Sequence, residues 1–313
     1  MYWQGTPPAS RARYRRGVDN REEVREFLVS RRARITPEQA GLPAGANRRV
    51  PGLRRGEVAA LADVSVEYYA KLERGALAGV SAGVLDAVAR ALRLDEAERA
   101  HLFDLARAAD GTAAIVRPRR RKTKQWVPHQ SLQWTLDAIT AGPAFVRNGR
   151  MDLLATNQLA RAFYAEVYAA DPHRPPNLSR FQFLAPGSRQ FYPDWDRLAD
   201  INVAILRTEA GRNPHDRELH DLIGELSTRS DEFRTRWGAH NVRHHGTGTK
   251  NYHHSVVGDL TLAYEGLEMA AEPGLTLTIY TAEPGSPSEE RLRLLASWAA
   301  SHEEPAAQPL SKR

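Results

Sequence analysis

Residues 52–75 constrain the fold more than any other stretch, because they form two short helical patterns joined by a tight turn. Their sequence is GLRRGEVAALADVSVEYYAKLERG. In the first pattern Val58 and Leu61 are expected to point inward, and Ala59 lets a second helix approach closely. The turn ends at Ser65, a residue type that caps helices by accepting a backbone N–H. This spacing predicts a helix-turn-helix, whose second helix enters the major groove of DNA.

The second helix has one side to bury and another to present. Residues at spacings of three are expected on the buried side: Val66, Tyr69 and Leu72. The other side chains point elsewhere: Glu67, Tyr68, Lys71 and Arg74. Because Tyr68 and Tyr69 are adjacent, they point apart. We expect Tyr69 in the core and Tyr68 toward DNA.

Three further helical patterns surround this motif, at 20–34, 81–92 and 95–109. Together with the two motif helices they predict an all-α five-helix bundle over residues 19–112. The flanking segments are rich in basic residues and are predicted to be an N-terminal arm (1–18) and a linker (113–128), the latter containing RPRRRKTK at 117–124.

The charge of the chain is divided unevenly. Residues 1–124 contain 25 Lys and Arg against 15 Asp and Glu, a net charge of +10, whereas residues 125–313 contain 19 against 23, a net charge of −4. Only the N-terminal part is therefore suited to a polyanion such as DNA. The chain has no cysteine, no signal-peptide pattern and no apolar run of the roughly 18 to 20 residues that a membrane helix needs. We expect a cytoplasmic protein.

The C-terminal part mixes both types of secondary structure, which predicts an α+β domain over 129–300 with an antiparallel sheet, followed by a tail at 301–313. Residues 144–157 contain an Asn-Gly pair between two apolar runs, the pattern of a β-hairpin. Alternating apolar residues predict strands within 256–269 and 274–283. Helices are predicted at 194–210 and 214–238, and from a cap at Ser286.

Two strings carry a family resemblance. Residues 57–75 resemble the XRE-type (Cro/repressor) helix-turn-helix, and the longer string 51–75 resembles the MmyB-like regulators. The resemblance continues in GPAFVRNGRMDLLATNQLARAFY, FYPDWDRLAD, LRTEAGRNPHD and VVGDLTLAYE. It implies a DNA-binding transcription regulator, with Glu73 pairing structurally with Arg31 or Arg32. It also implies the DNA-contacting residues: Ser65, Val66, Glu67, Tyr68, Lys71 and Arg74.

For the C-terminal domain, the same resemblance implies a PAS-like fold that binds a small amphiphilic, fatty-acid-like ligand. The residues nominated for that site are Phe145, Asn157, Phe163, Trp195, Arg236, Trp237, His240 and Tyr264, with Arg236 or His240 at the polar end. No cofactor is expected. Operator symmetry favours a homodimer, with two recognition helices about one DNA turn apart.

Two alternatives for the C-terminal domain remain. It is either a ligand-binding domain or a module that only dimerises. A metal site formed by His240, His244, His245, His253 and His254 is the weaker alternative, because GTGTK (246–250) is expected to form a turn that breaks a helix and no HExxH arrangement is present. No nucleophile motif such as GxSxG occurs, so the chain is not expected to be an enzyme.

Overall fold

Contacts between Cα atoms divide the protein into two compact units. The first unit comprises Met1–Thr123 and Asp200–His244, and the second comprises Lys124–Ala199 and His245–Arg313. The computed structural model describes residues 20–43, 48, 50, 52–110, 126–172, 175–239 and 246–301. The predicted basic arm, most of the basic linker and nearly all of the C-terminal tail lie outside these residues.

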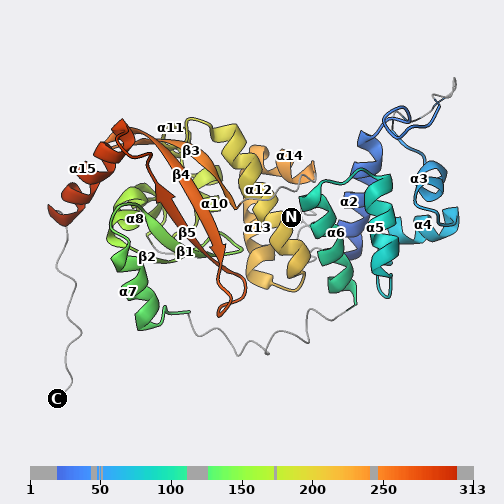
Figure 1. Ribbon diagram of the computed structural model, residues 1–313, viewed down its shortest axis with the longest axis horizontal. Helices are drawn as coiled ribbons and strands as arrows, with labels where there is room; N and C mark the ends of the chain where they lie inside the picture. Colours follow the sequence, from blue (N-terminus) through green and yellow to red (C-terminus); the bar gives the residue numbers. More distant parts are fainter. Residues whose placement is uncertain are drawn as a thin grey trace, which may run out of the picture. The chain divides into compact units, whose positions relative to one another are not determined.

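Among the described residues, five helices form the N-terminal part of the first unit, as the sequence predicts (Figure 1). Side chains from all five share one core, in which Phe27, Tyr69 and Leu102 are each 0% exposed. Leu61 was expected in this core but is 38% exposed, so that prediction is wrong. Instead the buried residue at this end of the first motif helix is Ala62, which directly follows the last residue of that helix. The five helices are α2 (Asn20–Arg34), α3 (Arg55–Leu61), α4 (Val66–Glu73), α5 (Ala82–Ala91) and α6 (Glu96–Ala109).

The turn between α3 and α4 is closed by local hydrogen bonds. The Val64 N–H donates to the Ala59 carbonyl at 3.0 Å. Asp63 adopts φ = 53°, a left-handed conformation that Asp tolerates better than most residues. Ser65 Oγ accepts from the Tyr68 N–H at 3.1 Å and caps α4, as predicted.

Three more helices belong to the first unit, although they lie far along the chain. They are the greater part of α12 (Trp195–Arg212), α13 (Arg217–Arg229) and α14 (Asp231–Gly238). The predicted helix 214–238 is divided at Ser230, whose extended backbone ends α13 and whose Oγ caps α14.

Buried charge joins these helices to the bundle. Arg207 of α12 is 0% exposed and forms an ion pair with Glu23 of α2. The same guanidinium lies 4.2 Å from the ring centroid of Trp237. Nearby, Arg212 Nε donates to Asp104 of α6 at 3.0 Å. Residues 200–239 therefore contact α2 and α6 through charged side chains, two of which, Arg207 and Glu23, are buried.

The second unit is built on a five-stranded antiparallel sheet, which confirms the predicted α+β class (Figure 1). The strand order is β2-β1-β5-β4-β3. The predicted hairpin and the two later strands are present, and β3 was not predicted. The strands are β1 (Ala144–Asn148), β2 (Leu153–Thr156), β3 (Thr247–His254), β4 (Gly258–Glu268) and β5 (Leu275–Thr281).

Strand β3 contains residues 247–250 of GTGTK, which we expected to form a turn, and that prediction is wrong. Its residues pair along their whole length with β4, from Thr247 opposite Glu265 to His254 opposite Gly258. Gly248 lies within this strand and Gly246 directly precedes it, and glycine disfavours strands, so the neighbouring strand rather than local preference makes this segment extended.

Both faces of the sheet are covered. Helix α7 (Gln130–Ala138) packs Leu132 and Leu136 on a face that includes Val146, with Leu277 partly buried there. Aromatic side chains fill the opposite face, where Tyr280 is 2% exposed. The remaining helices of this unit are α8 (Gln158–Phe163), α9 (Ala165–Ala170), α10 (Leu178–Leu184), α11 (Ser188–Phe191) and α15 (Pro287–Ser301), the last beginning at the predicted Ser286 cap.

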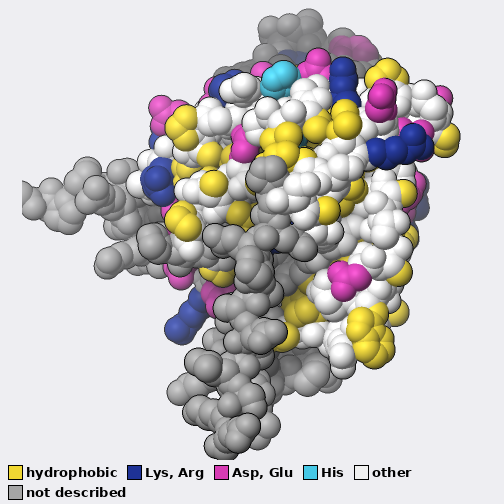
Figure 2. Space-filling model, turned by 90° about the vertical axis from the view of Figure 1, so that its left-hand side faces the viewer, with side chains coloured by type: hydrophobic (Ala, Val, Ile, Leu, Met, Phe, Trp, Pro, Cys, Tyr) yellow, Lys and Arg dark blue, Asp and Glu magenta, His cyan; other side chains and the backbone are white. Residues whose placement is uncertain are grey.

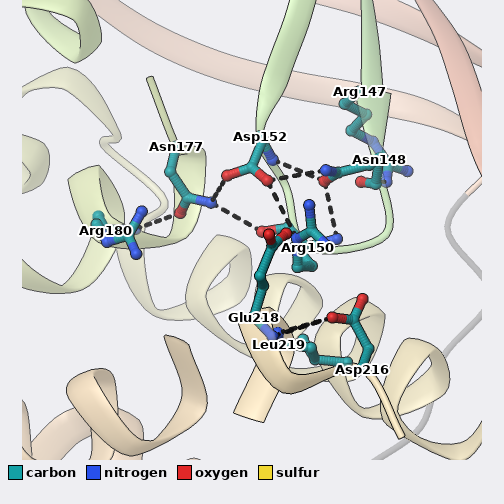
Figure 3. A network of polar contacts seen from close by, with 9 residues as sticks. All are labelled: Arg147, Asn148, Arg150, Asp152, Asn177, Arg180, Asp216, Glu218 and Leu219. Carbon is teal, nitrogen blue, oxygen red and sulfur yellow. Dashed lines mark hydrogen bonds and ion pairs between the residues drawn. The ribbon is translucent and has the colours of Figure 1, made fainter. Parts of the chain in front are cut away.

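A polar network holds the loop of the β1–β2 hairpin (Figure 3). Asn148 Oδ1 accepts from the backbone N–H groups of Arg150 and Asp152, each at 3.0 Å. The Asp152 carboxylate accepts from Asn148 Nδ2 at 2.8 Å and from Asn177 Nδ2 at 2.7 Å. Asn177 Oδ1 in turn accepts from the Arg180 N–H at 2.9 Å and caps α10. The hydrogen bonds of these side chains therefore stabilise the backbone of the hairpin loop and the start of α10.

The surface of the molecule seen in Figure 2 carries hydrophobic side chains in small groups between polar areas. Trp134 of α7 and Leu294 of α15 are the large hydrophobic residues most exposed on helices of the second unit, at 62% and 57%. Among the described residues, no helix combines the length and apolar character required to cross a bilayer.

Candidate functional site

Helix α4 presents a polar face beside a buried one. Tyr69 and Leu72 are buried as predicted, whereas Val66, which we placed on the same side, is 48% exposed at the start of the helix. Tyr68 is half-buried and packs at the edge of the core. The other nominated DNA-contacting residues are exposed: Ser65, Glu67, Lys71 and Arg74.

A buried carboxylate fixes the orientation of this helix. Glu73, at the C-terminal end of α4, is 1% exposed. Its Oε1 accepts from Arg32 Nη2 of α2 at 2.9 Å, and its Oε2 accepts from Arg55 Nε of α3 at 3.0 Å. The hydrogen bond and charge of Glu73 raise the pKa of Arg55. Of the two partners that the sequence offered, Arg32 forms this pair and Arg31 pairs with Glu98 instead.

Sequence reasoning missed a second ion pair that holds α3. Arg48 donates through Nη1 and Nη2 to the two oxygens of Glu57, at 2.7 and 2.8 Å. Glu57 also accepts from the Arg54 N–H at 2.6 Å, which anchors the first turn of the helix. The Arg48 hydrogen bond is the main cause that lowers the pKa of Glu57 to about 2. Position three of a helix is a recognised place for Glu, and that signal was available in the sequence.

An aromatic cluster occupies the covered sheet face of the second unit. Phe163, nominated for the ligand site, is 0% exposed and lies 4.8 Å from Tyr252 between ring centroids. Phe145, also nominated, lies 5.3 Å from Tyr164. Tyr264 lies 6.1 Å from Tyr280 at the edge of the cluster. The structure thus brings Phe145, Phe163 and Tyr264 to one sheet face.

The ammonium group of Lys250 lies against this cluster, and the sequence analysis did not predict a role for this residue. Lys250 Nζ lies 3.2 Å from Tyr280 Oη and 4.3 Å from the ring centroid of Tyr264. Burial lowers the pKa of Lys250. Burial alone would raise the pKa of Tyr280, but the Lys250 charge and hydrogen bonds from Tyr164, Tyr252 and Lys250 outweigh it and lower that pKa. Burial raises the pKa of Tyr264 to about 12.

Asn157 and Trp195, also nominated for the ligand site, form hydrogen bonds to backbone groups of the second unit. Asn157 caps α8 by accepting from the Ala160 N–H at 2.7 Å, and its Nδ2 donates to the carbonyls of Ile139 and Gly142 at 2.6 and 2.9 Å. Trp195 Nε1 donates to the Gln182 carbonyl at 3.1 Å. These polar groups are already hydrogen-bonded within the protein.

The remaining nominated residues are not part of the aromatic cluster. Arg236 lies on α14 of the first unit and pairs with Asp200 at 3.0 Å and with Glu232. Trp237 stacks on Phe233 with 5.6 Å between ring centroids. His240 lies outside the described residues.

The histidines of β3 point to opposite faces of the sheet. His254 is 2% exposed, whereas His253 is partly exposed and lies 2.6 Å from Asp259. His244 and His245 lie outside the described residues. Within the part of the chain that is described, no three His, Cys, Asp or Glu side chains come close enough together to hold a metal ion.

Comparison with known families agrees with both units. Residues 21–102 match the model of a helix-turn-helix domain. Residues 128–295 match the MmyB-like transcription regulator ligand binding domain, which covers more than half of the chain. The chain belongs to the MmyB-like transcription regulator family. A search of curated protein sequences found no match.

Membership of this family assigns a general role to the helix-turn-helix domain and to the C-terminal domain. This MmyB-like regulator is a DNA-binding transcription regulator with a ligand-binding C-terminal domain. The matched ligand-binding range includes α12, α13 and α14, which pack with the DNA-binding helices in the first unit. The matched ligand-binding range therefore contributes helices to the same compact unit as the helix-turn-helix.

Proposed function

We propose that this MmyB-like regulator reads its operator through α4 and changes its DNA affinity when the second unit binds an amphiphilic, fatty-acid-like molecule. The observation that supports DNA reading is the exposed polar side of α4. Lys71 and Arg74 lie on that side with Glu67, while Tyr69 and Leu72 hold the helix to the core. Such a helix matches the size and hydrogen-bonding pattern of the major groove.

The residues divide into two roles along α4. Val66, Glu67, Tyr68 and Lys71 lie in its first turns and would face base edges, as in other recognition helices. Ser65 and Arg74 flank the helix and would contact phosphates, which add affinity without sequence preference.

The aromatic sheet face supports the proposed ligand. A site for an amphiphile needs a mostly apolar lining with a few polar groups. Phe145 and Phe163 provide aromatic surface on this face, and Lys250 and Tyr280 are polar groups among these rings.

The ion pairs between residues 200–239 and the DNA-binding helices support a route from ligand to DNA. Residues 200–239 belong to the matched ligand-binding range, yet Arg207 pairs with Glu23 of α2 and Arg212 with Asp104 of α6. A ligand that binds two arrangements of these helices unequally would shift their populations and so change operator binding.

The test uses the full chain and an operator selected from a random DNA pool. Dodecanoate is expected to change the operator Kd by about 5-fold or more, the range of ordinary allosteric coupling. A Tyr68→Ala/Lys71→Ala variant should lose operator binding but still bind dodecanoate. Saturating dodecanoate that leaves the operator Kd unchanged would contradict the coupling.

We also propose that the protein binds its operator as a homodimer, because one α4 spans only a few base pairs. Trp134, exposed on α7, is a large apolar side chain available for such contact. Light scattering combined with footprinting tests this, and a monomer that protects a single half-site would refute it.

A further inference from the structure

Val66 is exposed at a position where neither core packing nor helix propensity accounts for it. It is the first residue of α4, directly after the Ser65 cap, and it is 48% exposed. Its spacing from Tyr69 and Leu72 favoured the core, yet those two residues are buried and Val66 is not. Valine is also a poorer helix former than alanine. A branched apolar side chain is therefore presented to whatever lies beside the start of α4.

Helix α3 leaves one flank of Val66 open. The neighbour on that side is Gly56, an exposed residue of α3, where an added Cβ would stand 3.9 Å from Val66 Cγ2. Because Gly56 has no side chain, it does not cover the methyl groups of Val66. A β-branched side chain has few rotamers, so these methyl groups form a fixed apolar surface.

Glu67 is the next residue, and it takes no part in capping α4. In α3 the acid that closes the first turn, Glu57, is the third residue after the cap and accepts from the Arg54 N–H at 2.6 Å. Glu67 is only the second residue after Ser65, and the third is Tyr68. The charge of Glu67 favours the N-terminal end of a helix, but its carboxylate oxygens are not used by the cap.

No cation pairs with Glu67 in the described part of the chain. Lys71 stands four residues later, the spacing at which Glu and Lys commonly pair on a helix surface, and both side chains are exposed. Neither forms an ion pair with any described residue. The exposed side of α4 therefore begins with a carboxylate, which only accepts hydrogen bonds, and its cations follow at Lys71 and Arg74.

A carboxylate that faces the major groove disfavours most bases. Guanine presents two acceptors there, thymine an acceptor and a methyl group, and adenine an acceptor beside a donor. Cytosine alone presents a donor and no acceptor. Each acceptor on a base edge repels the carboxylate, and so do the phosphates. Glu67 is therefore favourable at a DNA surface only where it meets a donor.

Val66 has a matching partner among the bases. The C5-methyl group of thymine is the apolar group on the major-groove edge. Consecutive Cα atoms lie about 3.8 Å apart, close to the step of about 3.4 Å between base pairs. Side chains at positions 66 and 67 therefore reach neighbouring base pairs.

We propose that Glu67 selects a cytosine in the operator and that Val66 selects a thymine in the adjacent base pair. This assignment rests on the proposed reading of DNA through α4 and names the bases that its first turn recognises. Glu67 lowers the affinity for most sequences, so specificity comes from the one base that relieves the repulsion.

The test selects operators for the full-length protein from a random DNA pool, in parallel for the wild type, Glu67→Gln and Glu290→Gln. Wild-type operators should keep a C·G pair beside a T·A pair. Glu67→Gln should prefer adenine in place of that cytosine, because a glutamine amide pairs with adenine N6 and N7. It should also bind unrelated DNA more tightly, since it removes a negative charge near the phosphates. Glu290→Gln removes an exposed acid from the first turn of α15 and should select the wild-type sequence.

Uracil in place of the selected thymine tests Val66, because this change removes only the methyl group. The wild type should bind the uracil operator about 3- to 5-fold more weakly, the effect of burying one methyl group. Val66→Ala should bind the two operators about equally. If Val66→Ala lost as much affinity as the wild type on the change to uracil, another side chain would contact the methyl group and the thymine assignment would be wrong.

The remaining outcomes separate this assignment from the proposed function. Wild-type operators without a shared C·G pair, or a Glu67→Gln variant that selects the wild-type sequence, would overturn the cytosine assignment while α4 still reads DNA. A uniform loss of affinity in Glu67→Gln with unchanged base preference would make Glu67 structural. If the wild type enriched no sequence from the pool, operator reading itself would be refuted.

Discussion

Arg32 of α2 donates to Glu73 of α4 at 2.9 Å, across 41 residues of sequence. This pair joins the first helix of the bundle to the proposed recognition helix. Since the same carboxylate also accepts from Arg55 of α3, one side chain sets the relative positions of three helices.

Glu73→Ala is expected to destabilise the first unit by about 3–5 kcal/mol, because it leaves the guanidinium groups without their buried partner. Operator affinity should fall with stability. Urea unfolding measures the first effect and fluorescence anisotropy with operator DNA the second. Glu67→Ala, an exposed change on the same helix, is the control and should leave stability within about 0.5 kcal/mol. Equal stability of the two variants would contradict the bridging role.

Lys71→Ala is expected to weaken operator binding and to reduce the dependence of log Kd on log salt concentration by about one unit, because one fewer cation displaces counter-ions from DNA. Gel-shift measurements over a salt series provide both values. Arg293→Ala removes an exposed charge from α15 and should change neither. An unaltered salt slope for Lys71→Ala would place this side chain away from DNA.

Arg207→Ala is expected to cost the first unit about 3–5 kcal/mol, because Glu23 would lose the buried guanidinium that pairs with it. The change lies 132 residues after Gly75, the last residue of the helix-turn-helix motif, yet it should lower operator affinity. Arg229→Ala breaks an exposed pair with Glu225 and should cost less than about 1 kcal/mol. If the two variants behaved alike, residues 200–239 would not belong to the folded DNA-binding unit.

The Arg48–Glu57 pair predicts a dependence of stability on pH. The pKa of Glu57 falls from 4.5 to about 2 in the folded protein, so the pair stabilises above pH 4.5 and this contribution is lost as the pH falls toward 2. Glu57→Gln should cost about 1 kcal/mol at pH 7, after discounting for the partial exposure of the pair. The difference from wild type should vanish near pH 2. Denaturant unfolding at both pH values measures it, and a pH-independent difference would show that charge is not involved.

Asn157→Ala is expected to destabilise the second unit by about 2–4 kcal/mol, since it removes the α8 cap and leaves the Ile139 and Gly142 carbonyls without a donor. Asn251→Ala, at an exposed position of β3, should cost less than about 1 kcal/mol. Thermal unfolding of both variants tests this. Unchanged stability together with weaker dodecanoate binding would return Asn157 to the ligand site.

The DNA-binding helices could be predicted because their signals are local. The Ser65 cap, the alanines of α3 and the spacing of Tyr69 and Leu72 all lie within 24 residues of sequence. The family resemblance, rather than a local signal, narrowed the partner of Glu73 to Arg31 or Arg32. Arg55 was missed because its pairing depends on how α3 packs across α4.

The second unit was harder to predict, because its order comes from distant pairing. Strand β3 contains Gly248 and is held extended by its pairing with β4. On β5 the alternating Leu277 and Ile279 were evident, but the aromatic face is defined by Tyr280, on the opposite side. Lys250 acquires its surroundings only when β3, β4 and β5 lie together.

The packing of Gly211 against His101 has a consequence for how the protein is made. A Cβ at Gly211 would stand 2.7 Å from the His101 ring, so α12 closes tightly over a histidine that is 1% exposed. During synthesis the N-terminal helices leave the ribosome first, and about 90 residues separate the end of α6 from Asp200. At usual rates of translation this interval lasts about 5 to 20 seconds. During this interval α12 has not yet been made, so the helix-turn-helix region lacks the helix that covers His101 and pairs with Glu23.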